Sequence, residues 1–171
     1  GATGAVGSKM MEKLVERNFP IGSIKFLASA RSAGKPIEFN GQTYTIEEAT
    51  PEAFEGVQIA LFSAGGSVSE ALAPEAAKRG AIVIDNTSHF RMHPQVPLVV
   101  PEVNRHALKD IPNGIIANPN CSTIQMVAAL QPLRERYGLT KVVVSTYQAV
   151  SGSGIAAIEE LRDQSAQWEK G

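Results

Sequence analysis

Short apolar runs alternate along the chain with longer segments in which apolar residues recur every three or four positions. The repeat of Val6, Met10 and Leu14 predicts a helix with one buried stripe. Strands are predicted at residues 24–28, 57–62, 81–84, 115–117 and 142–149. Further helices are predicted at residues 69–79, 103–109, 122–137 and 155–168. Asn40-Gly41 predicts a hairpin turn, because both positions tolerate positive φ. The alternation indicates an α/β fold with a doubly wound, mostly parallel sheet of the Rossmann type.

Composition and charge argue against several classes of protein. The 171 residues are 43% hydrophobic, enough for one domain core and the beginning of another. Because 16 Lys and Arg balance 17 Asp and Glu without a basic block, we expect no binding to nucleic acid. No apolar run reaches the roughly 18 to 20 residues that span a bilayer, so we expect no membrane insertion. A single cysteine cannot form an internal disulfide, which favours the cytoplasm.

The first residues form a glycine-rich loop that is typical of dinucleotide binding. Gly1, Gly4 and Gly7 have the spacing GxxGxxG, which lets the backbone approach a pyrophosphate at the start of a helix. After the next predicted strand, Arg31 stands among serines where NAD enzymes carry an acid, and this favours the 2′-phosphate of NADP. The loop after residue 62 should lie at the same edge of the sheet, where the cofactor would bind. The predicted cofactor-binding residues are Thr3, Gly4, Ala5, Val6, Ser29, Arg31, Ser32, Ser63, Ala64 and Gly65. The alternative is a set of ordinary turns that bind nothing.

Cys121 is the most informative single residue. It follows the turn Asn118-Pro119-Asn120 and opens a predicted helix. The amide donors and dipole of a helix start favour a thiolate, which attacks carbonyl carbon well. The same amides could hold the oxyanion that forms. The alternative is a buried structural cysteine. The polar turn before Cys121 favours the nucleophile.

Six motifs together resemble the aspartate-semialdehyde dehydrogenase family, and they cover nearly the whole chain. They are GATGAVG at Gly1, SARSAG at Ser29, DNTS at Asp85, VPEVN at Val100, NPNCST at Asn118 and YQAVSGSG at Tyr147. The resemblance implies reduction of L-4-aspartyl phosphate to L-aspartate 4-semialdehyde with NADPH, with release of phosphate. This step belongs to the biosynthesis of lysine, methionine, threonine and isoleucine. It also implies a homodimer that pairs through the second domain.

The resemblance further implies roles for individual residues. Cys121 would displace phosphate and form a thioacyl intermediate that accepts hydride. Asn120 would orient the phosphate or the oxyanion, and Arg91 would bind the phosphate. Gln148 would orient the substrate beside the sulfur. No metal is expected.

The same resemblance divides the chain into two domains. Residues 1–121 would form the NADP-binding domain, and residues 122–171 would begin the catalytic and dimerisation domain with its first strand and helix. The family's catalytic histidine and its arginine for the substrate carboxylate would lie beyond the chain, since His89, His93 and His106 match neither motif. We therefore expect a truncated piece that lacks most or all activity. Its sheet would have a gap where the strand before Gly1 is missing.

Two other interpretations stay open. N-acetyl-γ-glutamyl-phosphate reductase shares the fold and the cysteine chemistry, but it usually carries Gly where this chain has Asn120. The glyceraldehyde-phosphate type of enzyme has a different cysteine context. A protein of another class, a nucleotide-binding module without activity, would use Cys121 only structurally.

Overall fold

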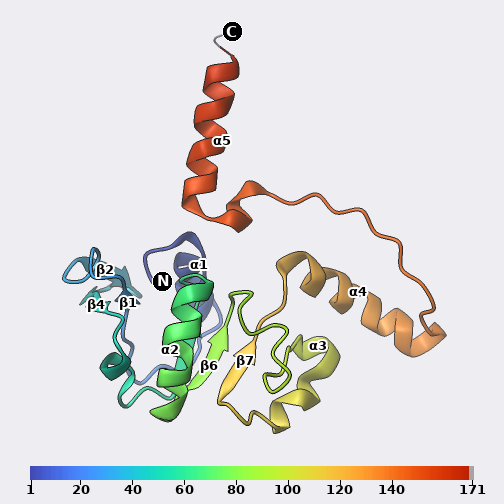
Figure 1. Cartoon of the computed structure of the whole chain (residues 1–171), viewed down its shortest axis with the longest axis horizontal. Helices are drawn as coiled ribbons and strands as arrows, with labels where there is room; N and C mark the ends of the chain where they lie inside the picture. The colour runs from blue at the N-terminus through green and yellow to red at the C-terminus, as the bar shows by residue number, and fades with distance from the viewer. Residues whose placement is uncertain (170–171) are drawn as a thin grey trace. The chain divides into compact units, whose positions relative to one another are not determined.

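The computed structural model describes residues 1–169 (Figure 1). The chain divides into two compact units. The first unit comprises residues 1–49 together with the segment that begins at Tyr147, and the second comprises Thr50–Thr146. Residues 170 and 171, which close the predicted second domain, lie outside the described part. The mixed α/β fold with parallel strands confirms the predicted fold class.

Within residues 1–49 of the first unit, one helix and two small sheets surround an aromatic core. The elements of this segment are α1 (Ala5–Glu16), β1 (Leu27–Ala28), β2 (Pro36–Phe39), β3 (Gln42–Thr45) and β4 (Glu47–Glu48). β1 and β4 are parallel, whereas β2 and β3 form the predicted hairpin, with Asn40 and Gly41 both at positive φ. The ring of Phe26 lies 5.5 Å from that of Phe39, and both are buried. The hairpin therefore supplies much of this core.

The buried face of α1 differs from the predicted stripe. Val6 is 37% exposed, whereas Gly7 is buried and Met11 and Leu14 pack against the aromatic core. The helical spacing and the place of Leu14 in the stripe are confirmed, whereas Val6 is wrong and Met11 packs against the core instead. The reason is that Gly7 has no side chain, which allows this side of the helix to lie closest to the preceding loop.

The second unit is built on a three-stranded parallel sheet in the order β5-β6-β7. The strands are β5 (Ile59–Phe62), β6 (Ile82–Asp85) and β7 (Ile115–Ala117). The helices are η1 (Pro51–Phe54), α2 (Gly66–Lys78), α3 (Pro101–Asn104), η2 (Arg105–Lys109) and α4 (Cys121–Tyr137). Val83 and Ile115 of the sheet are almost fully buried, as are Ala73 and Ala76 of α2. Each strand and helix predicted between residues 57 and 137 occurs within three residues of its expected start.

The strand predicted at residues 142–149 is wrong. Residues 138–149 have no regular secondary structure and lead into η3 (Val150–Ser153) and α5 (Ile155–Trp168). Val143 is 85% exposed and Tyr147 is 99% exposed. β-branched residues make a strand favourable only when a neighbouring strand satisfies the backbone N–H and C=O groups. Among residues 1–169, no strand pairs with this segment.

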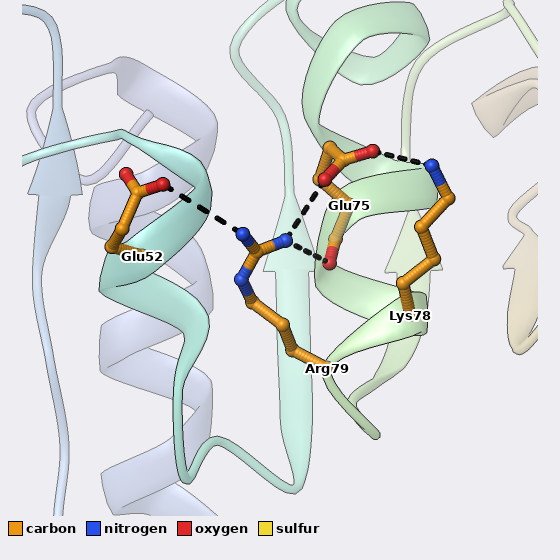
Figure 2. A network of polar contacts seen from close by, with 4 residues as sticks. All are labelled: Glu52, Glu75, Lys78 and Arg79. Atoms are coloured by element: carbon orange, nitrogen blue, oxygen red, sulfur yellow. Dashed lines mark hydrogen bonds and ion pairs between the residues drawn. The ribbon is translucent and has the colours of Figure 1, made fainter.

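A cluster of ionic side chains joins η1 to the end of α2 (Figure 2). The Nη1 of Arg79 donates to the carboxylate of Glu75 at 2.9 Å, and its Nη2 lies 3.7 Å from the carboxylate of Glu52. Lys78 donates to the other oxygen of Glu75 at 2.6 Å. Hydrogen bonds from Lys78 and then Arg79 hold the pKa of Glu75 below its ordinary value.

Glu75→Gln should therefore reduce stability in a pH-dependent way. A carboxyl group whose pKa is lowered by folding stabilises the protein above its unfolded pKa, and this contribution is lost as the pH falls through the folded pKa. We expect a small drop in Tm for the variant near neutral pH, and convergence with the wild type below about pH 4. Thermal unfolding between acidic and neutral pH measures the difference. Glu70→Gln, on the same helix, is the control, and an equal effect of both substitutions would contradict the role of the cluster.

Candidate active site

Three loops meet at the carboxyl edge of the β5-β6-β7 sheet. The register places Phe62 opposite Asp85, and Asp85 opposite Ala117, so the three strands end side by side. In open parallel sheets, this edge is where ligands bind. The residues that follow are Ser63–Gly65 after β5, Asn86–Arg91 after β6 and Asn118–Cys121 after β7. The edge therefore gathers predicted site residues from three separate parts of the sequence.

Asp85 forms the fully buried end of β6. Its Oδ1 accepts hydrogen bonds from the hydroxyl of Ser69 at 2.8 Å and from the backbone N–H of Thr87 at 3.0 Å. Its Oδ2 accepts the hydroxyl of Thr87 at 2.8 Å. These bonds compensate for burial of the carboxylate. They also connect the first turns of α2 to the loop that carries Arg91.

Arg91 bridges the loops that follow β6 and β7. Its Nε donates to the backbone carbonyl of Asn118 at 3.0 Å, and its Nη2 donates to that of Asn86 at 3.1 Å. The side-chain amide of Asn118 donates to that of Asn86 at 2.6 Å. An arginine carries five N–H groups, so donors remain for an anion beyond these two bonds. The half-buried guanidinium is thus held in place and can still bind a phosphate.

Asn120 caps the helix that Cys121 begins. Its Oδ1 accepts hydrogen bonds from the backbone N–H groups of Ser122 at 3.1 Å and Thr123 at 3.2 Å. The side-chain oxygen therefore holds the first turn of α4, which leaves only the side-chain nitrogen for a substrate. Cys121 is exposed, which disfavours the alternative of a buried structural cysteine. The exposed thiol at a capped helix start can act as a nucleophile.

In the first unit, the glycine-rich loop lies beside the end of β1. The N–H of Ala2 donates to the carbonyl of Leu27 at 3.2 Å. Gly4 precedes α1 and makes no side-chain cap, which leaves first-turn amides for a bound anion. Gly7 is needed for close packing, since a Cβ there would lie 2.3 Å from the carbonyl oxygen of Gly1.

The predicted 2′-phosphate residues form a turn directly after β1. The N–H of Ser32 donates to the carbonyl of Ser29 at 2.8 Å, and Arg31 between them is exposed. The link from Ala2 to Leu27 keeps this turn close to the glycine-rich loop. A pyrophosphate and an adenosine 2′-phosphate are the two anions of NADP, and the first unit offers a candidate group for each.

The structure brings together only part of the predicted site. Arg91, Asn120, Cys121 and the loop Ser63–Gly65 belong to the second unit, whereas the glycine-rich loop, Arg31 and the exposed Gln148 belong to the first. The sequence interpretation missed four residues of the carboxyl edge, namely Ser69, Asp85, Asn86 and Asn118. The sequence did contain a signal for them, namely the acidic Asp85 at the end of an apolar strand. A carboxylate buried at such a position needs hydrogen-bond donors from neighbouring residues. No cluster of His, Cys, Asp and Glu within residues 1–169 could hold a metal ion.

Two family models match the chain. The semialdehyde dehydrogenase NAD-binding domain matches residues 1–111, and the semialdehyde dehydrogenase dimerisation domain matches residues 130–171. The chain belongs to the semialdehyde dehydrogenase family. The division into domains at residues 121 and 122 stays a prediction.

Two relatives show the branch of the family to which the chain is most similar among the proteins named here. Aspartate-semialdehyde dehydrogenase of Bacillus subtilis (strain 168) is 66% identical over 164 residues, which cover 96% of this chain and 47% of that protein. That of Aquifex aeolicus (strain VF5) is 56% identical over 100% of this chain and 51% of its own length. Identities of 66% and 56% place the chain among the aspartate-semialdehyde dehydrogenases of this family. The chain spans about half the length of these relatives.

Solved structures agree with this membership. A crystal structure of aspartate semialdehyde dehydrogenase II from Vibrio cholerae, complexed with ASA, has a TM-score of 0.94 and 52% identity over 100% of this chain and 51% of that one. A crystal structure of aspartate semialdehyde dehydrogenase with NADP from Candida albicans has a TM-score of 0.67 and 28% identity over 81% of this chain and 46% of that one.

Within the described residues, no helix has the length and apolar character needed to cross a membrane.

Gly7→Ala should damage the glycine-rich loop. The added Cβ would meet backbone oxygens of Gly1 at 2.3 Å and Ala2 at 2.9 Å, which can yield only by moving α1. We expect a loss of about 1–3 kcal/mol in unfolding free energy and weaker binding of a nicotinamide dinucleotide. Urea unfolding and a fluorescence titration of the full-length protein measure both.

Gly22→Ala is the matched control for this substitution. Nothing lies within 4 Å of a Cβ at Gly22, and its φ is not positive. It should leave both quantities unchanged. Similar behaviour of the two variants would show that close packing at Gly7 is not required.

Proposed function

We propose that this chain is the cofactor-binding part of an NADPH-dependent aspartate-semialdehyde dehydrogenase, which converts L-4-aspartyl phosphate to L-aspartate 4-semialdehyde and phosphate. The observation that carries the proposal is the carboxyl edge, where an exposed Cys121 at a capped helix start shares one set of loops with Arg91. Relatives of that name, up to 66% identical, support it. The pair suits an acyl phosphate, because such a substrate offers a carbonyl carbon beside a dianion.

In this proposal, Cys121 and Arg91 act on the two halves of the acyl phosphate. The Cys121 thiolate attacks the carbonyl carbon, the S–C bond forms, and the C–O bond to phosphate breaks. Arg91 stabilises the charge on the leaving phosphate. NADPH, when bound, supplies the hydride that reduces the thioacyl carbon. The resulting hemithioacetal releases the aldehyde and returns the thiolate.

Asn120 and Gln148 have supporting roles in the same proposal. The oxygen of Asn120 keeps the first-turn amides of α4 aligned, and its side-chain nitrogen can donate to the phosphate or the oxyanion. Gln148 would orient the substrate beside the sulfur. None of the described residues is assigned as the general acid/base or as the arginine for the substrate carboxylate, and a chain without these groups would lack most or all activity.

The proposed cofactor is NADP, bound by the residues that the sequence predicts. Thr3, Gly4, Ala5 and Val6 would hold the pyrophosphate at the start of α1. Ser29, Arg31 and Ser32 would hold the 2′-phosphate, and Ser63, Ala64 and Gly65 would line the rim after β5. The exposed Arg31 in a turn without an acidic residue supports NADP over NAD.

The remaining properties proposed for the whole protein concern its assembly and location. The match to a dimerisation domain supports a homodimer that pairs through the second domain, which would begin at residue 122. A substrate in amino-acid biosynthesis and a single cysteine, which cannot form an internal disulfide, support a cytoplasmic enzyme.

Cys121→Ser in the full-length protein should abolish turnover. A serine hydroxyl at this position stays largely protonated and is a poor nucleophile, so activity should fall by several orders of magnitude. Because Cys121 is exposed, the Tm should be unchanged. Oxidation of L-aspartate 4-semialdehyde, with phosphate and NADP present, measures the reaction in reverse.

A substrate panel and thiol alkylation separate the other interpretations. Preference for N-acetylglutamyl semialdehyde would identify the reductase instead. If Cys121 reacted with iodoacetamide no faster than glutathione at the same pH and the serine variant kept full activity, the non-catalytic module would be correct.

Arg31→Ala should weaken NADP binding selectively. A hydrogen bond to a charged group contributes roughly 1.5–3 kcal/mol, which is about a 10- to 150-fold change in Kd. The affinity for NAD should change little. Lys35→Ala removes a nearby exposed cation and is the control. Equal wild-type affinity for the two nucleotides, or equal effects of the two substitutions, would contradict the role of Arg31.

A further inference from the structure

Asp85 is a buried ionisable residue that the proposed reaction does not use. It is 0% exposed at the end of β6, directly beneath the loops that carry Arg91 and Cys121. Burial of a carboxylate is costly, and an apolar residue of similar volume is often no worse for stability. Its three hydrogen bonds offset this cost without explaining why a carboxylate stands here.

The hydrogen bonds of Asp85 lead to both carbonyl groups that orient Arg91. Thr87 donates twice to the carboxylate, through its N–H and its hydroxyl, and so fixes the turn that contains Asn86. The carbonyl of Asn86 accepts Nη2 of Arg91. On the other side, the carbonyl of Asp85 accepts the N–H of Asn118, whose own carbonyl accepts Nε of Arg91.

A third contact ties the same carboxylate to the helix that follows β5. The hydroxyl of Ser69 donates to Asp85, and Ser69 is itself 0% exposed in α2. A carboxylate is suited to this junction because its two oxygens accept several bonds at once. An asparagine would carry an NH₂ group in place of one carboxylate oxygen. Because that group is itself a donor, at least one of the donors from Ser69 and Thr87 would lose its acceptor.

We infer that Asp85, through Thr87, is a positioning residue for the guanidinium of Arg91 and thereby sets the affinity for the phosphate group. Asp85 touches neither the substrate nor the sulfur. The inference rests on the proposed function only in taking Arg91 as the phosphate ligand.

The test compares Thr87→Val with Thr87→Ser in the full-length protein. Valine keeps the size of threonine and removes the hydroxyl that donates to Asp85 and accepts from the N–H of His89. Serine keeps both contacts. The first readout is the phosphate concentration that half-protects Cys121 from iodoacetamide, which requires no turnover. The second is the set of KM values for phosphate, NADP and the aldehyde in the reverse reaction.

We expect Thr87→Val to raise the half-protecting phosphate concentration and the KM for phosphate roughly two- to tenfold. The KM for NADP should change less, and Thr87→Ser should match the wild type. A merely structural role would change all constants together with the Tm. Equal phosphate constants in the three proteins, or absence of phosphate protection in the wild type, would overturn the inference.

The experiment also covers two further outcomes, a variant that does not fold and a wild type that lacks the proposed activity. If Thr87→Val does not fold, Asp85→Asn replaces it, since that variant keeps the size of the side chain and removes one of the carboxylate oxygens that accept from Thr87. A raised phosphate constant then supports the inference and an unchanged one overturns it. If the wild type does not oxidise L-aspartate 4-semialdehyde, the proposed function fails, while the protection assay still decides the role of Asp85.

Discussion

The hydrogen-bonded register of β5, β6 and β7 is the constraint on which the candidate active site depends. It places Phe62, Asp85 and Ala117 in one row, so the loops that follow them begin at the same edge. The buried carboxylate of Asp85 then joins two of these loops to α2. Backbone carbonyl and N–H groups hold Arg91 and the turn before Cys121, and the positions of these groups change little when side chains move. A slip in strand pairing would therefore separate the nucleophile from the proposed phosphate ligand.

Both units have a proposed site at the start of a helix, and the two helix starts are capped differently. α1 follows Gly4, which provides no side-chain cap and leaves amides for a pyrophosphate. α4 follows Asn120, whose oxygen satisfies the amides of Ser122 and Thr123. The second arrangement keeps the first turn rigid around Cys121. The difference fits the two tasks, since one helix start would bind an anion and the other would present a thiolate.

The sequence predicted elements whose causes are local. β7 and α5 were predicted at their observed residues, and the Asn40-Gly41 hairpin was confirmed, because helix periodicity and turn preferences act over a few residues. The segment 142–149 failed for the opposite reason. Its residues favour a strand, but a strand exists only with a partner, and the described residues provide none. The place of Val6 in the buried stripe of α1 was wrong for a similar reason, since packing at Gly7 selected Met11 over Val6 for the buried side.

The sequence by itself determined the chemical groups of this protein: the glycine-rich loop, Arg31 without an acidic neighbour, and Cys121 at a helix start. These depend on residue type and on spacings within one short segment. Only the tertiary structure decided how Arg91 is oriented and what the carboxylate of Asp85 does. Those contacts join residues 16, 27 and 32 positions apart, and no local pattern encodes them. They exist because parallel strands bring distant chain segments to a common edge, where buried polar groups must find one another.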